Sequence, residues 1–229
     1  METYPKSQRN TVKRIPKRGH YDKKTLFEIL DNGFFCHVSF VIDGQPFIIP
    51  TAYGREGERI FIHGATSSRM IGALEKGIQV CLAVTHIDGI VMARSVFHHS
   101  MNYRSSVIFG TATIVREEEK VQALEVITQN ICRGRWQEAR LPNNTELKAT
   151  QVLAIQIEEA SSKIRTGMPV DDTEDYSLDV WAGVVPVQSV YGQPVADPDL
   201  KKRLPIPDSV HNLLDLNKSR GSGNGISST

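Results

Sequence analysis

Apolar and polar side chains alternate between residues 34 and 42. Every second residue from Phe34 to Ile42 is apolar, and His37 and Ser39 fall between them. A period of two residues is typical of a strand with one buried face. The pair Asp43-Gly44 predicts a tight hairpin, because aspartate and glycine tolerate positive φ. A returning strand covers residues 45–53, and a turn at 55–58 leads into a third strand at 59–63.

Three later apolar runs predict further strands. Residues 78–87 are almost wholly apolar, which suits a strand buried on both faces, and Asp88-Gly89 then predicts a hairpin into residues 90–97. Residues 105–115 predict a long strand in which Gly110 indicates close backbone packing or a bulge. Alternation returns over residues 149–160, which we expect to be the last strand. Pro50 lies inside its strand and cannot donate to a ladder, so it indicates an edge, a bulge or a different neighbour.

Helical signals are few. Asp22 is the expected N-cap of a short helix that ends at Asn32-Gly33, and residues 67–76 predict a second short helix. The acidic residues 117–119 open a third helix, where negative side chains complement the positive end of the helix dipole. Short hairpin-linked strands with so few helices predict an α+β fold that is mainly antiparallel β: a small barrel with a few peripheral helices.

The two ends of the chain differ from the barrel region. We expect a basic N-terminal arm at residues 1–20, a barrel domain at 21–207 with a C-terminal extension from about residue 168, and a flexible tail at 208–229. The arm is a phosphate- or nucleic-acid-binding segment or a solvated extension; without interleaved aromatic residues we favour the second and expect no nucleic-acid partner. Its cations are Lys6, Arg9, Lys13, Arg14, Lys17 and Arg18.

Composition narrows the class of protein. Hydrophobic residues make up 40% and charged residues 23%, which is ordinary for a globular protein. No apolar run approaches the roughly 18 residues of a spanning helix, and no secretory signal pattern is present, so we expect a cytoplasmic protein without a membrane partner. Cys36, Cys81 and Cys132 are far apart and lack metal-ligand spacing, so we expect no metal.

Three polar stretches stand at strand ends. Ser67, Ser68 and Arg69 open a helix, where free backbone N–H groups and a guanidinium would bind an anion; the alternative is a serine cap beside a surface arginine. Tyr103 and Arg104 would offer a flat ring and a cation to an aromatic anionic ligand. The neighbouring residues His98 and His99 point to opposite faces of an extended chain and would not share a metal. In the third stretch, Lys163 and Arg165 face the same side.

Together these stretches resemble the pyridoxamine 5′-phosphate oxidase-like superfamily of FMN-binding split barrels, and more closely its flavin-nucleotide-binding, nitroimidazole-resistance-type branch. The resemblance rests on residues 14–22, 48–53, 61–70, 97–110, 162–172 and 181–186. It implies a homodimer with two FMN sites between the subunits. Two departures from the true oxidase make vitamin B6 oxidation doubtful: its C-terminal arginine-and-histidine signature has no counterpart, and Met70 stands where the oxidase has a second phosphate-binding cation.

The resemblance also implies roles for individual residues. It places Pro50, Thr51, Ala52 and His63 along or beside the flavin ring, and Ser67, Ser68 and Arg69 at the flavin phosphate. It implies that Asn102, Tyr103, Arg104 and Ser105 reach the flavin from the partner subunit, and that Lys163 and Trp181 lie near the cofactor.

Several functions remain open from the sequence. The leading hypothesis is an FMN-dependent oxidoreductase that acts on a small, aromatic or nitro substrate. A non-catalytic flavin carrier or sensor would need the same cofactor residues. A haem- or deazaflavin-binding split barrel is the third alternative, with His63, His98 or His99 as haem contacts. No carboxylate pair or activated nucleophile indicates a hydrolase.

Overall fold

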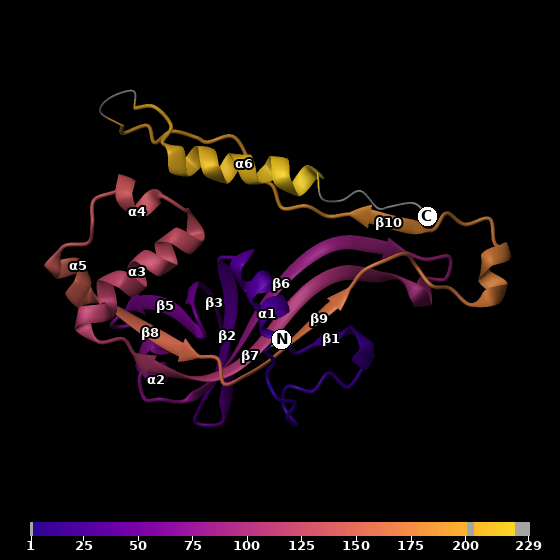
Figure 1. Cartoon of the computed structure of the whole chain (residues 1–229), viewed down its shortest axis with the longest axis horizontal. Helices are drawn as coiled ribbons and strands as arrows, with labels where there is room; N and C mark the ends of the chain where they lie inside the picture. Colours follow the sequence, from indigo (N-terminus) through magenta and orange to yellow (C-terminus); the bar gives the residue numbers. More distant parts are fainter. Residues whose placement is uncertain (1, 201–203, 223–229) are drawn as a thin grey trace.

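The computed structural model describes residues 2–200 and 204–222, with side chains up to residue 217. Figure 1 shows a barrel, a long two-stranded arm that curves away from it, and a C-terminal segment that runs back above both. The arm is formed by the two longest strands, β6 and β7. The mainly antiparallel sheet and its few helices confirm the predicted fold class.

One sheet forms the barrel, with the strand order β3-β2-β6-β7-β8-β5-β4. Strand β9 pairs with β7 beside β8, the two-residue strand β1 pairs with β9, and β10 pairs with β6. The strands are β1 (Gly19–His20), β2 (Phe35–Ile42), β3 (Gln45–Ala52), β4 (Gly54–Glu56), β5 (Arg59–Ala65), β6 (Gln79–Met92), β7 (Ser100–Ile114), β8 (Thr150–Gln156), β9 (Glu159–Arg165) and β10 (Gly183–Pro186).

The first hairpin forms as its pattern predicts. Asp43 (φ 49°) and Gly44 (φ 78°) connect β2 and β3, and both central residues have the positive φ that a tight two-residue hairpin requires. Cys36, Val38 and Phe40 of β2 are buried in the main core, while His37 is exposed. Strand β3 ends the strand order, so Pro50 lies on an edge strand.

Two strand predictions are wrong. Asp88-Gly89 is not a hairpin: β6 continues to Met92 through a register shift between Ile87 and Gly89, and the chain turns only at residues 93–99. A β-bulge accounts for the Asp88-Gly89 pair, because a bulge, like a tight turn, favours a residue without a bulky side chain. Strand β6 is also not buried on both faces, since its burial alternates along its length.

The predicted last strand is two strands. Residues 150–156 form β8 and pair with β5, and residues 159–165 form β9 and pair with β7. Strand β7 pairs with both of these strands: its residues Tyr103–Phe109 pair with β9, and its residues Ala112–Ile114 pair with β8. The barrel therefore splits where β7 changes partner.

The helices lie at the edges of the barrel. Asp22 caps α1 as predicted, because its carboxylate accepts from the Thr25 N–H at 2.8 Å. The second predicted helix is shorter than expected and begins at Arg69, after the N-cap Ser68. The helices are α1 (Lys23–Asp31), α2 (Arg69–Leu74), α3 (Glu117–Ile131), α4 (Arg135–Glu138), α5 (Asn144–Ala149) and α6 (Asp208–Ser222), with short 3-10 turns η1 (Pro16–Arg18), η2 (Val96–His98) and η3 (Thr173–Ser177). No helix in the described ranges is long and apolar enough to cross a membrane.

The N-terminal arm is packed against the barrel, which corrects the expectation of a solvated extension. Tyr4 is only 5% exposed and its hydroxyl donates to Glu58 at 2.9 Å. Arg9 forms ion pairs with Glu158 and Glu159. The burial of Tyr4 helps to offset the entropy cost of ordering this segment, so the N-terminal arm packs on the barrel through Tyr4 and Arg9, whereas most of its basic side chains are exposed.

Tyr4→Phe is expected to lower the free energy of unfolding by about 1.5–3 kcal/mol, because it removes one hydrogen bond to a carboxylate and keeps the buried ring. Chemical denaturation of the full chain measures this loss. Tyr176→Phe is the matched control, since Tyr176 is 54% exposed and no hydrogen bond of its hydroxyl is found in the described part of the chain. Equal stability of the Tyr4 variant and the wild type would mean that the basic N-terminal arm is not anchored to the barrel through Glu58.

The C-terminal segment is also more ordered than the sequence predicts. Residues 208–222 form α6 where we expect a tail, and residues 223–229 lie outside the described residues. The Ser209 N–H donates to Glu138 at 3.1 Å, which joins α6 to α4. Further back, β10 adds an antiparallel strand to the arm at β6.

Candidate functional site

The outer face of the sheet collects several predicted site residues. We use outer face for the side of β3, β2, β6, β7 and β9 that points away from the main core. In an antiparallel ladder, directly paired residues carry their side chains on the same side. Register pairs join Ala52 to Phe35, Pro50 to His37, Tyr103 to both Ile87 and Arg165, and Ser105 to both Thr85 and Lys163. Pro50, Ala52, Tyr103, Ser105 and Lys163 therefore lie on one face.

The outer face also exposes large apolar side chains. Phe35 is 47% exposed, Ile48 63% and Ile87 41%, although each belongs to a paired strand. Exposed apolar residues grouped on one sheet face are typical of a surface that is covered by another molecule. The apolar residues lie among the predicted flavin contacts, so one surface combines both features.

Arg165 is a residue of this face that sequence reasoning mentioned but did not include in the site. It is only 6% exposed, and its guanidinium donates to the Asn102 side-chain oxygen and to the Gly167 carbonyl at 3.4 Å. No carboxylate pairs with it among the residues that the structure describes. Burial lowers the pKa of Arg165, and the neighbouring charge of Arg18 lowers it further. The signal in the sequence was its two-residue spacing from Lys163.

Asn102 and Arg104 are already engaged within the chain. Asn102 is buried, and its amide donates to the Gly167 carbonyl at 3.1 Å. Arg104 donates to both carboxylate oxygens of Asp88, at 3.0 and 2.8 Å, which raises its pKa. The sequence did not predict this pair, because it depends on the bulge that turns Asp88 toward β7. A flavin contact by Arg104 stays a prediction.

A second group of predicted residues lies at β5 and α2. Ser67, Ser68 and Arg69 stand between the end of β5 and the first turn of α2, and the Ser68 hydroxyl makes no capping hydrogen bond. The Arg69 guanidinium lies 5.4 Å from the Phe47 ring centroid of β3, and it forms no ion pair within the described ranges. Met70 is 7% exposed and packs into the main core, so this position faces inward.

His63 is the most unusual side chain of this second group. It lies on β5 opposite Val152, and its Nδ1 is buried without a hydrogen-bond partner in the described structure. A buried ring nitrogen without a partner costs free energy unless a ligand or water meets it. Burial lowers the pKa of His63 from its ordinary value. Burial therefore favours the neutral form of the His63 ring and leaves its Nδ1 available to a ligand.

We expect His63 to titrate below its ordinary value of 6.5, because burial disfavours the imidazolium. The unfolded chain then binds more protons than the folded chain, so stability falls as the pH drops below about 6.5. An NMR titration of the His63 ring in the ligand-free protein measures the pKa. Titration at or above 6.5 would contradict the burial of this ring.

The two groups are joined at β3 but not along β7. The Arg69 guanidinium lies 5.4 Å from the ring centroid of Phe47, which precedes Pro50 by three residues on β3. Thr51 pairs with the buried Cys36 and faces away from the outer face. Within the described structure no contact joins Arg69 to Tyr103, Ser105 or Lys163.

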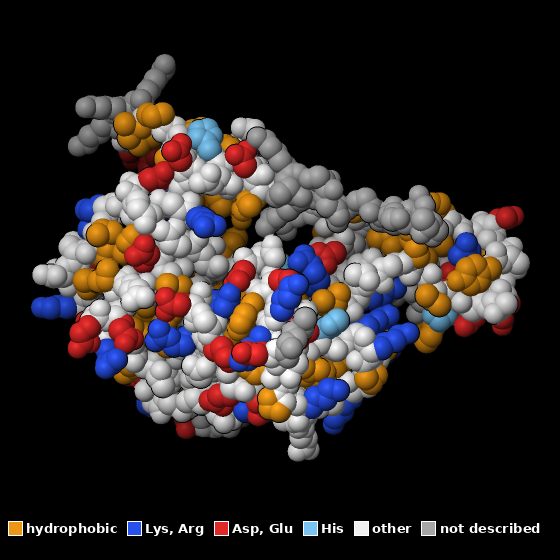
Figure 2. Space-filling view, in the orientation of Figure 1, with side chains coloured by type: hydrophobic (Ala, Val, Ile, Leu, Met, Phe, Trp, Pro, Cys, Tyr) orange, Lys and Arg blue, Asp and Glu red, His pale blue; other side chains and the backbone are white. Residues whose placement is uncertain are grey.

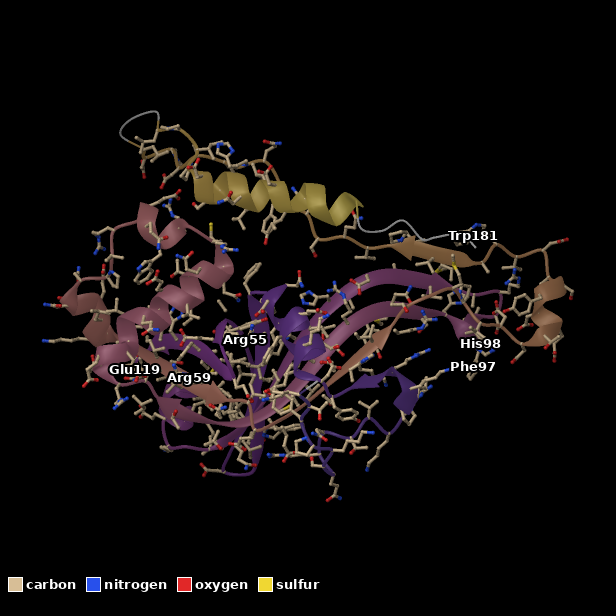
Figure 3. The ribbon with its side chains drawn as sticks, viewed as in Figure 1. Arg55, Arg59, Phe97, His98, Glu119 and Trp181 are labelled. Carbon is tan, nitrogen blue, oxygen red and sulfur yellow. The ribbon has the colours of Figure 1, made fainter. Side chains whose placement is uncertain are left out.

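Trp181 lies apart from both groups. It is 68% exposed, and its indole ring packs against Gly183, the first residue of β10. Figure 3 shows it on the C-terminal segment above the arm, near the tip that carries Phe97 and His98. Arg55, Arg59 and Glu119 lie at the opposite side of the molecule.

A groove of about 1030 Å³ lies between α3, α6 and the end of α1. Figure 2 shows it as a hollow beneath the C-terminal segment. Its lining mixes amides and charged groups with apolar residues such as Phe34, Ile131 and Leu213. None of the predicted site residues is among its described lining residues, so this groove and the predicted site are separate.

Comparisons with known proteins agree with the split barrel. A family model described as pyridoxamine 5′-phosphate oxidase matches residues 22–164. The flavocytochrome Anf3 from Azotobacter vinelandii is 36% identical with a TM-score of 0.85, and the match covers 90% of this chain and 97% of Anf3. An FAD and haem binding protein from Mycobacterium smegmatis is 36% identical with a TM-score of 0.83, and the match covers 86% of this chain and 97% of that one.

A more distant structure supports the fold alone. It is a protein assigned to 5-nitroimidazole antibiotic resistance in Bacteroides thetaiotaomicron, 18% identical with a TM-score of 0.55, and the match covers 64% of this chain and 86% of that one. Among proteins with curated annotation, no match was found. The family model spans more than half of the chain, and two solved structures exceed 30% identity over most of it. The chain belongs to the pyridoxamine 5′-phosphate oxidase-like family of flavin-binding split barrels.

Proposed function

We propose that this protein is a homodimeric, flavin-dependent oxidoreductase that acts on a small substrate. The observation that carries the proposal is the likeness over nine-tenths of the chain to a flavocytochrome. The sequence resemblance implies FMN, whereas the name of the Mycobacterium smegmatis relative points to FAD. A flavin supplies hydride and single-electron chemistry, and the protein supplies binding, orientation and electrostatics.

The residues at β5 and α2 fit a flavin phosphate. Arg69 has no carboxylate partner in the described structure, and Ser67 and Ser68 add hydroxyl donors beside it. The unused Nδ1 of His63 suits a polar group of the same ligand. We propose that Ser67, Ser68 and Arg69 hold the phosphate and that His63 donates to, or accepts from, the ligand as a neutral imidazole.

The outer face fits the rest of the site in a dimer. Its apolar side chains would be buried against a second copy of the chain, and no contact in the described structure joins its polar residues on β7 and β9 to Arg69. A partner subunit would therefore contribute Tyr103, Ser105 and Lys163 to the flavin held at the other subunit's Arg69. Arg165 adds a buried positive charge beside them.

Identification of the bound cofactor tests the proposal. The protein is purified, its absorption spectrum is recorded, and the small molecule released by denaturation is identified by mass. The mass distinguishes FMN from FAD, and sedimentation of the loaded protein gives the oligomeric state. A protein that neither carries nor binds FMN or FAD, or that binds flavin as a monomer, would refute the proposal as stated.

Anaerobic addition of NADH or NADPH then separates an enzyme from a carrier or sensor. A reductase bleaches its flavin with one of these donors and passes the electrons on to a nitroaromatic compound. Flavin that stays oxidised with both donors favours the non-catalytic alternative.

Haem binding is the second candidate, because both 36%-identical relatives bear names that point to haem. His99 at the arm tip suits an axial ligand, since its Nδ1 meets the Ser95 carbonyl at 3.0 Å and leaves Nε2 for a metal. Phe97 and Val96 beside it are almost fully exposed, as expected of a surface that contacts an apolar macrocycle. A Soret band in the purified protein, lost in His99→Ala, would support this candidate.

A further inference from the structure

The tip of the arm brings one imidazole and two carboxylates together. His98 ends η2 at the turn between β6 and β7, and Asp172 and Asp175 belong to the start of η3 in the C-terminal segment. One nitrogen or oxygen from each residue lies within 4.8 Å of the other two, and His98 Nε2 is 3.3 Å from Asp172 Oδ2. Figure 3 shows His98 at this tip, beside the C-terminal segment.

The two aspartates are aligned by the backbone. Asp172 is the N-cap of η3, and the Asp175 N–H donates to the Asp172 carbonyl at 3.0 Å. Asp172 has extended backbone just before η3, and Asp175 lies within η3. Their carboxylate oxygens lie within 4.8 Å of each other.

A buried carboxylate fastens η3 to the arm. The Asp171 side chain accepts from the backbone N–H groups of Arg94 and Ser95, at 3.0 and 3.1 Å, and from the Arg94 guanidinium at 3.3 Å. This side chain is fully buried, so the segment that carries Asp172 is held next to the turn that carries His98. The proximity of the three groups therefore does not depend on a single exposed ion pair.

His98 is positioned from its own side as well. Ser95 caps η2 by accepting from the Phe97 N–H at 3.3 Å, and the Phe97 ring meets the His98 ring edge-on with centroids 5.2 Å apart. The neighbouring His99 ring is turned away to the Ser95 carbonyl. Only one of the two adjacent histidines can therefore join the aspartates.

From this geometry we propose that His98, Asp172 and Asp175 form a site for a divalent transition-metal ion that fastens the C-terminal segment to the tip of the arm. Bonds of about 2.0–2.1 Å in tetrahedral geometry place two ligand atoms about 3.3–3.4 Å apart, which matches the spacing of His98 and Asp172. One imidazole with two carboxylates suits Zn²⁺, Mn²⁺, Fe²⁺ or Co²⁺ rather than Ca²⁺. The inference uses none of the proposed flavin contacts.

The test is a titration of the chelator-treated, untagged full chain with ZnCl₂ and MnCl₂ by calorimetry. We expect one ion per chain and at least tenfold weaker binding in His98→Ala and in Asp175→Asn. His211→Ala and Asp179→Asn are matched controls, because each removes a group of the same type outside the cluster. Equal affinity in the wild type and His98→Ala, or a tenfold loss in His211→Ala, would overturn the proposal.

Co²⁺ provides a second measurement that does not depend on stability. The visible absorption bands of bound Co²⁺ are expected in the wild type and absent in Asp175→Asn at equal protein concentration. A spectrum identical in both proteins would mean that the ion binds elsewhere. Flavin content, recorded in the same samples, reports separately on the proposed function.

Discussion

Arg69→Ala is expected to weaken flavin binding about 10- to 150-fold, which corresponds to the roughly 1.5–3 kcal/mol of a hydrogen bond to a charged group. Arg69 forms no ion pair in the described part of the chain, so its charge is not already compensated by a carboxylate. A flavin phosphate could therefore pair with the Arg69 guanidinium without displacing a carboxylate side chain. Titration of the cofactor-free dimer with FMN and with FAD, followed by flavin fluorescence, measures the change.

Arg59→Ala is the matched control for this experiment. Arg59 lies on the same strand as His63 but pairs with Glu56 and Glu119, and Figure 3 places it beside Glu119. Its loss should leave flavin affinity unchanged while removing one positive charge from β5. If Arg69→Ala binds both flavins as tightly as Arg59→Ala does, the phosphate does not lie at α2.

Met70 sharpens this expectation. A second phosphate-binding cation would normally follow Arg69 in the oxidase, but position 70 lies on the inward side of α2 and is buried in the main core. A charge there would be desolvated, which is costly without a partner. The departure from the oxidase pattern therefore agrees with the burial of Met70, and the proposed anion site would depend on Arg69 without a second cation at position 70.

The sequence predicted what depends on local pattern. The β2–β3 hairpin was correct, because alternation sets the faces of the strands and the turn requires positive φ at Asp43 and Gly44. The helix cap at Asp22 was correct for the same local reason. The bulge at Asp88-Gly89 was mistaken for a turn, since both features use residues with little steric demand.

Features that depend on distant contacts were not predictable. The pairing of Arg104 with Asp88 requires the bulge, and the burial of Arg165 requires β9 to lie beside β7. The order of the N-terminal arm depends on Glu58, more than fifty residues from Tyr4. The approach of Asp172 to His98 likewise needs the C-terminal segment to return to the arm. The type of each side chain marks it in the sequence as a possible interacting residue, but only the tertiary structure determines which residue it contacts.

Gly110→Ala is expected to destabilise the protein by about 3 kcal/mol or more, because backbone overlap costs at least as much as an overpacked core. A methyl group at this position would overlap the carbonyl oxygen of Gln156. Gln156 is the last residue of β8, and β9 begins at Glu159. Chemical denaturation measures the loss, and reduced soluble yield reports it if the variant does not fold.

Gly72→Ala is the control that isolates the cause. Gly72 lies within α2 with open space around its α-carbon, so alanine there should be neutral or stabilise by about 0.5–1 kcal/mol. Gly110 instead lies where β7 changes from pairing with β9 to pairing with β8, and there the Gln156 carbonyl leaves no room for a side chain. A loss confined to Gly110→Ala would identify the close approach of the Gln156 carbonyl as a contact that fixes β8 and β9 on β7. Equal stability of the two variants would mean that β8 can shift away from β7, and that the split does not depend on this glycine.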